Sequence, residues 1–72
     1  MDNLFTPAQY ANFDLIGQDG NAFFLVGGWR KQARRDGWSS EDIDKVVGEA
    51  TSGNYDHLVA TLAAHSNEGM GW

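Results

Sequence analysis

The sequence predicts a mainly α-helical fold, with a small α+β fold as the alternative. Apolar residues recur with helical spacing in three segments, each segment follows a residue that can cap a helix, and glycine-containing breaks separate the segments. We therefore expect three packed helices at about 21–36, 40–51 and 55–65. A short N-terminal helix and one short strand near 12–16 are expected before them.

The N-terminal segment carries the signature of a short helix near 6–11. Thr6 is a suitable N-cap, Pro7 fits the first helical position, and Gln9 completes a Thr-x-x-Gln capping box. In such a box the two side chains satisfy main-chain N–H groups that have no partner inside the helix. The pattern predicts local structure and is silent about activity.

The next residues alternate in the manner of a strand. Phe13 and Leu15 lie on one side of an extended chain, Asp14 lies on the other, and Gly17 ends the pattern. A single strand needs a pairing partner. We expect that partner to be another segment of the chain, a second copy of it, or the C-terminal tail.

The segment 21–36 is predicted to be the central helix. Asp19 or Asn21 can cap its N-terminus, and Gly37 is expected to end it as a left-handed C-cap. Phe24 points nearly opposite to the apolar stripe that we expect in the core. That stripe consists of Ala22, Val26, Trp29 and Ala33, with Leu25 at its edge.

Two glycines lie inside this helix, where each costs about 1 kcal/mol relative to alanine. Gly27 and Gly28 indicate either a bend or close approach of another backbone, or a flat patch where a partner lies beside Phe24. Phe24 itself belongs either to the core or to that exposed patch.

The second and third helices have clear caps and apolar stripes. Ser39 precedes acidic residues in the first turn of the second helix, and Asn54 or Asp56 caps the third. The second stripe is Ile43, Val46, Val47 and Ala50, and the third is Tyr55, Leu58, Val59 and Leu62. We expect residues 1–65 to form one small helical domain and residues 66–72 a loose tail.

Composition excludes several classes of protein. The chain of 72 residues has no cysteine, so it has neither a disulfide framework nor a thiolate metal site. No basic segment followed by an apolar run begins the chain, and no apolar stretch reaches membrane-spanning length, so we expect neither export nor membrane insertion. A net charge of −5 argues against nucleic acid as the default partner, and nucleic-acid binding stays an open alternative. Self-association would help to stabilise a chain of this size, so a homodimer is one of the expected arrangements.

Three runs of residues form a distinctive set: Asp-Gly-Asn-Ala-Phe at 19–23, Ala-Arg-Arg before Gly37, and Glu-Ala-Thr-Ser-Gly-Asn-Tyr-Asp-His-Leu at 49–58. Together they resemble the pattern DGNAF…ARKAG…EATSGDYDHLL of a group of short uncharacterised proteins encoded by tailed phages and prophages. The likeness covers about residues 13–64. It implies only a phage or mobile-element setting, and it carries no activity or functional residues. Phe24, Gly28 and the segment from His65 to Trp72 depart from the pattern. The absence of cysteine fits a reducing cytoplasm, so we expect a host cytoplasmic location.

No constellation of residues predicts catalysis, a metal or a cofactor. His57 and His65 lie eight positions apart on one predicted helix, whereas paired helical ligands are normally three or four apart. The Asp-x-Asn at 19–21 superficially resembles a calcium loop, but Phe24 and Arg30 stand where glycine and glutamate are required. We expect no enzyme.

The leading hypothesis is a non-enzymatic interaction protein of phage type that binds a larger protein or nucleoprotein complex. One form is an inhibitor of host defence, similar to anti-CRISPR proteins, whose acidic surface blocks a nucleic-acid channel. The residues expected to bind the partner are Asp42, Asp44, Glu49, Asp56 and Phe24.

Two alternatives remain open. The first is a small nucleic-acid-binding protein that uses the basic face of the central helix, and the second is an accessory protein of virion assembly. The basic face comprises Arg30, Lys31, Arg34 and Arg35. The acidic and basic groups also fit a simpler interpretation, as solvated surfaces that attract each other within the molecule.

Overall fold

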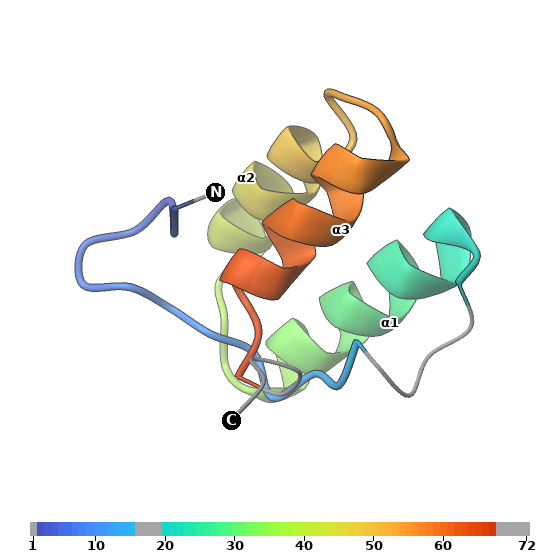
Figure 1. The fold of residues 1–72 in the computed structure, drawn as a ribbon. Coiled ribbons are helices and arrows are strands. Elements are labelled where there is room, and N and C mark those ends of the chain that lie inside the picture. The colour runs from blue at the N-terminus through green and yellow to red at the C-terminus, as the bar shows by residue number, and fades with distance from the viewer. Residues whose placement is uncertain (1, 16–19, 68–72) are drawn as a thin grey trace.

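The computed structural model describes residues 2–15 and 20–67, which contain three packed helices. Their bounds are α1 Ala22–Arg35, α2 Ser40–Ala50 and α3 Tyr55–Ala64. Helices α2 and α3 lie side by side as a hairpin, and α1 packs against both (Figure 1). The mainly α-helical class is therefore confirmed. Two predicted features lie outside the described residues: the strand end at Ile16 and Gly17, and the alternative cap Asp19.

Helix α1 begins and ends at the residues that local sequence chemistry favours. The side-chain oxygen of Asn21 accepts a hydrogen bond from the N–H of Phe23 at 2.8 Å. Gly37 adopts a left-handed φ of 93° just after the helix, and the N–H of Trp38 donates to the carbonyl of Ala33 at 3.0 Å. This is the hydrogen bond of a Schellman motif, so the predicted glycine C-cap is confirmed.

Helices α2 and α3 also begin at side-chain caps. Ser39 Oγ accepts a hydrogen bond from the N–H of Asp42 at 3.1 Å. Asn54 Oδ1 accepts one from the N–H of His57 at 2.9 Å, so Asn54, and not Asp56, is the cap of α3.

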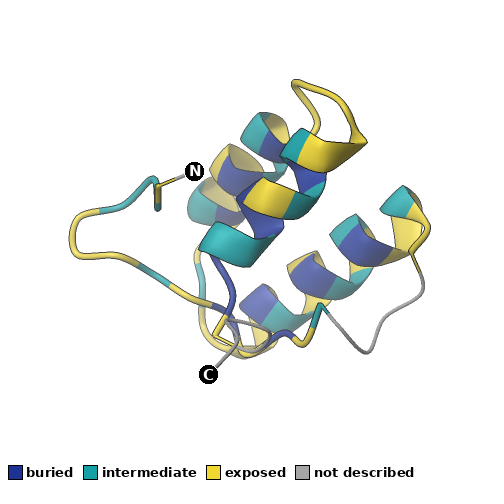
Figure 2. Ribbon diagram, in the orientation of Figure 1, coloured by how far each residue is buried: buried dark blue, intermediate teal, exposed yellow. Residues whose placement is uncertain are grey.

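Trp29 of α1 lies at the centre of the core and is fully buried. Its Nε1 donates to the carbonyl of His65 at 3.2 Å, and its ring meets Trp38 edge to face with centroids 5.1 Å apart. Each helix turns a buried side toward this core (Figure 2). The buried apolar residues are Ala11, Phe13, Leu25, Trp29, Ala33, Ile43, Val46, Ala50, Leu58 and Leu62.

The predicted helix near 6–11 is wrong, because the N-terminal segment is a loop organised by Asn3. Asn3 Oδ1 accepts a hydrogen bond from the N–H of Gln9, and Asn3 Nδ2 donates to the carbonyls of Gln9 and Ala64. The Gln9 side chain, expected in a capping box, donates instead to Asp42 at 3.0 Å. Long-range hydrogen bonds to α2 and α3 thus replace the local pattern.

The predicted strand near 12–16 is also wrong over its described part, residues 12–15. A single parallel bridge joins Ala11 to Ser66, and pairing does not continue into the alternating residues. The N–H of Asn12 donates to the carboxylate of Asp36 at 2.7 Å instead of to a neighbouring strand. The alternation of Phe13 and Leu15 reflects burial of one side of a loop.

Two residues that the sequence analysis placed in the loose tail pack with the domain. Ser66 is fully buried, and its hydroxyl donates to the carbonyl of Leu62. The N–H of Asn67 donates to the carbonyl of Ala11 at 2.9 Å. The remaining tail residues, 68–72, lie outside the described part of the chain.

Candidate functional site on helix α1

Half of helix α1 faces solvent. Leu25, Trp29 and Ala33 face the core. At about 100° per residue, a second set of positions falls on the opposite half of the helix, and all of them are exposed. We call this set the outer face of α1: Phe23, Phe24, Gly27, Arg30, Lys31, Arg34 and Arg35.

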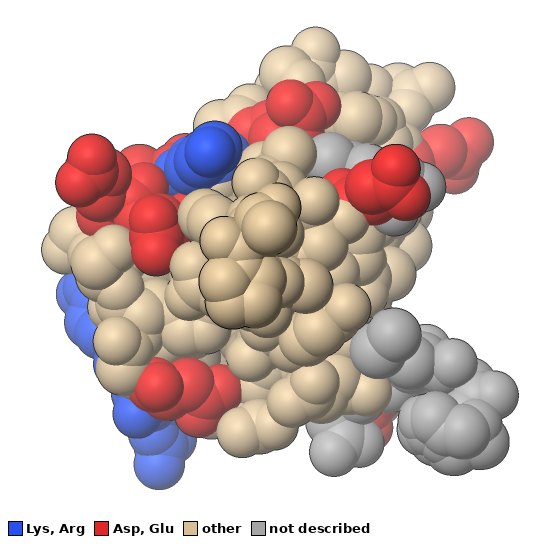
Figure 3. All heavy atoms as spheres, turned by 90° about the vertical axis from the view of Figure 1, so that its left-hand side faces the viewer, with Lys and Arg blue, Asp and Glu red and all other residues tan. Residues whose placement is uncertain are grey.

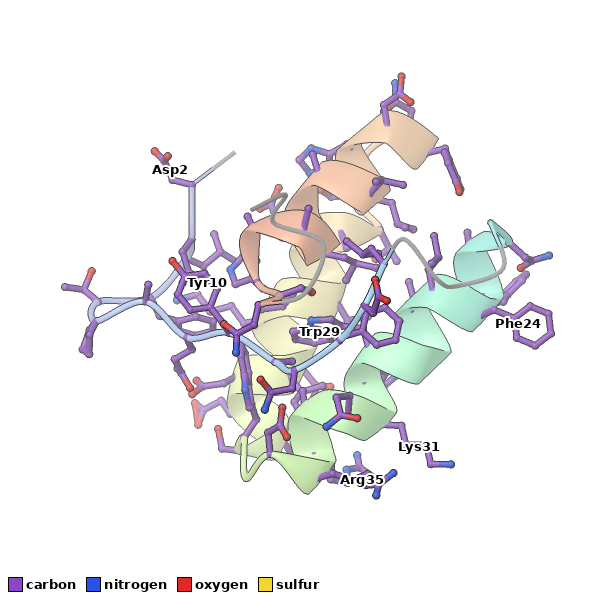
Figure 4. The ribbon with its side chains drawn as sticks, turned by 60° about the horizontal axis from the view of Figure 1, so that its bottom comes forward. Asp2, Tyr10, Phe24, Trp29, Lys31 and Arg35 are labelled. Atoms are coloured by element: carbon purple, nitrogen blue, oxygen red, sulfur yellow. The ribbon has the colours of Figure 1, made fainter. Side chains whose placement is uncertain are left out.

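The first turn of α1 presents an exposed aromatic pair. Phe23 is 89% exposed and Phe24 is 64% exposed, which answers the question left open for Phe24. Figure 4 shows the Phe24 ring pointing away from the other helices. Tyr55 of α3, half-exposed, lies at the same end because its hydroxyl donates to the carbonyl of Gly20. Three large aromatic side chains are thus exposed at one end of the molecule, which makes this end a candidate interaction surface.

The two mid-helix glycines have different surroundings. A Cβ at Gly28 would lie 3.0 and 3.2 Å from carbons of the buried Phe13 ring, so Gly28 allows close packing of that ring. A Cβ at Gly27 would meet no described atom within 4 Å. The close-approach interpretation therefore fits Gly28, where the approaching group is a side chain, while Gly27 leaves a flat, open area beside the phenylalanines.

The last two turns of α1 are basic. Arg30 pairs with Asp44 of α2 at 3.5 Å, and both side chains are largely exposed, so the pair contributes little to stability. Lys31, Arg34 and Arg35 form no ion pair with any described residue. Lys31 and Arg35 project from the same side of the helix as Phe24 (Figure 4). Arg34 and Arg35 also complement the negative end of the helix dipole.

The acidic residues expected to bind a partner differ in their contacts and their exposure. Asp42 accepts a hydrogen bond from Gln9, and Glu49 accepts one from His57, so both hold the fold together. Asp44 and Asp56 are exposed, on different helices. Figure 3 likewise shows acidic side chains in several separate groups on the face that it draws.

Both histidines have structural contacts. His57 Nε2 lies 2.8 Å from the Glu49 carboxylate, which links α2 to α3. His65 is fully buried: its Nε2 accepts from the N–H of Leu4 at 3.0 Å, and its Nδ1 donates to the carbonyl of Thr61 at 2.7 Å. Burial lowers the pKa of His65. Sequence reasoning weighed His65 only as a metal ligand and missed this role.

The described residues contain no pocket and no group of three side chains placed to hold a metal ion. No helix among them is both long and apolar enough to cross a bilayer. No protein-family model, curated protein or solved structure matches the chain. The outer face of α1 is the candidate site because of its exposed rings and cations.

Proposed function

We propose that the protein is a non-enzymatic interaction protein of phage or prophage type that binds a larger protein or nucleoprotein complex in the host cytoplasm. The observation that carries this proposal is the exposure of Phe23 and Phe24 on a helix face that also holds four basic residues. Phenylalanine and arginine are both enriched at the cores of protein interfaces, and arginine is also among the residues that most often supply binding energy there. Helix α1 holds them on a rigid element, because its other side is anchored by Trp29.

Affinity capture from host cells tests this function. The tagged protein, a Phe23→Ser/Phe24→Ser variant and a Tyr10→Ser control are expressed at equal levels and recovered at moderate salt. Tyr10 is a suitable control because it is an exposed aromatic residue of the N-terminal loop. We expect a stoichiometric complex with the wild type and the control, and its loss with the double variant. Recovery of all three proteins without a partner would overturn the proposal.

Inhibition of a host defence complex is the more specific form of this proposal. The net charge of −5 and the exposed carboxylates of Asp44 and Asp56 support it, because acidic groups can occupy a basic nucleic-acid channel. In this form, an Asp44→Lys/Asp56→Lys variant loses inhibition in a plasmid- or phage-interference assay. Full inhibition by that variant would reject the acidic mechanism.

Nucleic-acid binding is the second candidate, favoured by Lys31, Arg34 and Arg35, which form no ion pair with described residues. A gel shift with single- and double-stranded DNA at low and moderate salt tests it. Binding that weakens with salt and disappears in an Arg34→Ala/Arg35→Ala variant would support this candidate. Co-purification with phage particles would instead support a role in virion assembly.

A further inference from the structure

We propose that the outer face of α1 docks on a protein partner whose surface combines an apolar cleft with a neighbouring cluster of carboxylates. This inference rests on the proposed function and names the surface and the partner chemistry for it. Three features support it: the exposed aromatic pair, the open glycine beside it, and a basic row at the other end of the same helix face.

The aromatic end calls for an apolar cleft. Phe23 and Phe24 stand in the first turn of α1, and Gly27 follows one turn later on the same face. Because no described atom lies near a Cβ at Gly27, a partner main chain can approach the helix there between the rings and the basic residues. In helix-in-groove binding, apolar side chains of one helix enter a hydrophobic groove of the partner, and the two rings are the side chains of the outer face that can do so.

The basic end calls for carboxylates. Lys31 and Arg35 stand seven and eleven residues after Phe24, which places them about 10–16 Å further along the helix axis. Helix α1 contains no acidic residue and holds four of the five basic residues of the chain. Its cations are therefore not neutralised from within the helix, and arginine binds carboxylates in a well-defined two-pronged geometry.

The same arrangement disfavours nucleic acid as the partner. Proteins that bind single strands combine stacking rings with cations along the whole strand, whereas here the rings and the cations occupy opposite ends of α1. Every acidic residue in the described part of the chain lies outside α1, and the molecule measures only 26 × 26 × 20 Å. Asp36 directly follows the basic end. A nucleic acid longer than the helix would be repelled by the acidic residues around α1. A compact cluster of carboxylates on a protein could contact the basic end of α1 without reaching those acidic residues.

A second copy of the chain fits the face less well. In a symmetric dimer, parallel α1 helices would set the four cations of one copy against the four of the other. Antiparallel α1 helices would set the rings of each copy against the cations of the other, and α1 offers those cations no carboxylate. The basic face of one copy could instead meet acidic residues of the next copy. In that contact both rings would lack a cleft to enter, because the described residues form no pocket.

Site-specific photo-crosslinking in host cells tests the inference. Phe24 is replaced by p-benzoylphenylalanine, which keeps an aromatic ring at the site, and Tyr10 is replaced in the same way as the control. We expect position 24, and not position 10, to crosslink to one protein, at an apolar residue with Asp or Glu side chains about 10–16 Å away. Capture of that protein alone does not suffice; the mapped residue and its acidic neighbours are the supporting result.

Two variants of the open glycines sharpen the test. Gly27→Leu adds a side chain in the middle of the outer face, and Gly48→Leu adds the same side chain to the exposed side of α2, where a Cβ also has open space. We expect Gly27→Leu to weaken binding of the crosslinked protein by about tenfold or more, and Gly48→Leu to leave it unchanged. Arg34→Glu/Arg35→Glu should weaken it too, with recovery when the partner's carboxylates are changed to lysine.

Each other outcome is decisive. Crosslinks from position 24 to nucleic acid, to a second copy, or to a surface without carboxylates overturn the inference. Crosslinks from position 10 alone overturn it while the proposed function stands, because a partner then binds elsewhere. The absence of a partner from both positions, with unfolding midpoints equal to wild type, overturns both.

Discussion

The N–H of Leu4 donates to Nε2 of His65 at 3.0 Å, so a fully buried imidazole ties the N-terminal loop to the end of α3. Because Nε2 accepts, the proton of the neutral ring lies on Nδ1, which donates to the carbonyl of Thr61. The carbonyl of His65 accepts from Trp29 Nε1 and from the N–H of Ala11. Protonation of Nε2 would remove the Leu4 hydrogen bond and place a charge in the core.

Stability should therefore fall in mild acid. Burial lowers the pKa of His65 below its usual 6.5, so the unfolded chain takes up the proton more readily than the folded protein. The stability that the neutral His65 ring contributes is fully present above about pH 6.5, and it is lost as the pH falls through the pKa of His65 in the folded protein. Urea unfolding between about pH 7.5 and pH 5 measures the loss, which should shrink in His65→Gln and persist in His57→Gln. An NMR titration in which the His65 ring protonates at or above 6.5 would contradict this account.

Asn3→Ala should detach the N-terminal loop. The Asn3 side chain makes hydrogen bonds to the main chain of Phe5, Gln9 and Ala64, and its removal leaves partly buried groups without partners. We expect a loss of about 1–3 kcal/mol in the free energy of unfolding and faster proteolysis of the first ten residues. Asn67→Ala is the control, since that side chain makes one exposed hydrogen bond and should change stability by less than about 0.5 kcal/mol. Equal effects of the two substitutions would refute the organising role of Asn3.

Alanine at the two glycines of α1 should have opposite consequences. Gly27→Ala should stabilise the protein by about 0.5–1 kcal/mol, because it improves helix propensity in open space. Gly28→Ala gains the same helix propensity but pushes a methyl group against the buried Phe13 ring. Its free energy of unfolding should therefore be about 1–3 kcal/mol lower than that of Gly27→Ala. Chemical unfolding of both variants gives this difference directly. If the two variants were equally stable, Phe13 would not pack on Gly28.

Gly37→Ala should destabilise the protein through the backbone alone. A Cβ at this position meets nothing within 4 Å, but the φ of 93° is unfavourable for alanine. We expect a loss of about 1 kcal/mol in thermal or urea unfolding, and a smaller loss for Gly37→Asn, since asparagine tolerates left-handed backbone. A Gly37→Ala protein as stable as wild type would argue against the Schellman cap.

Local signals sufficed to predict the three helices and failed for the N-terminal loop. Ser39, Asn54 and Gly37 act within one turn of the residues they cap, so their chemistry is readable from neighbours in the sequence. The Thr-x-x-Gln box is an equally good local signal. The helix that it predicts does not form, because Asn3 bonds to Ala64 and Gln9 bonds to Asp42 instead. Both bonds join residues that are far apart in the sequence.

The candidate site could be predicted only in part. Helical geometry places Phe24 opposite the core stripe, and the basic residues are visible in the sequence. Phe23, however, flanks that stripe, so its exposure of 89% depends on tertiary packing and cannot be read from helical geometry. The acidic set could not be judged in advance, because the contacts of Asp42 and Glu49 depend on tertiary packing.

The most direct test of the proposed contact surface is an affinity measurement on the complex recovered from host cells. The wild type and Phe24→Ala are titrated against that complex, and the free energy of unfolding of each protein is measured in parallel. The exposed ring should matter little for folding, so we expect stabilities within about 0.5 kcal/mol and an affinity at least about 30-fold weaker for Phe24→Ala. Equal affinities at equal stability would contradict the claim that the outer face of α1 is the surface through which this protein acts.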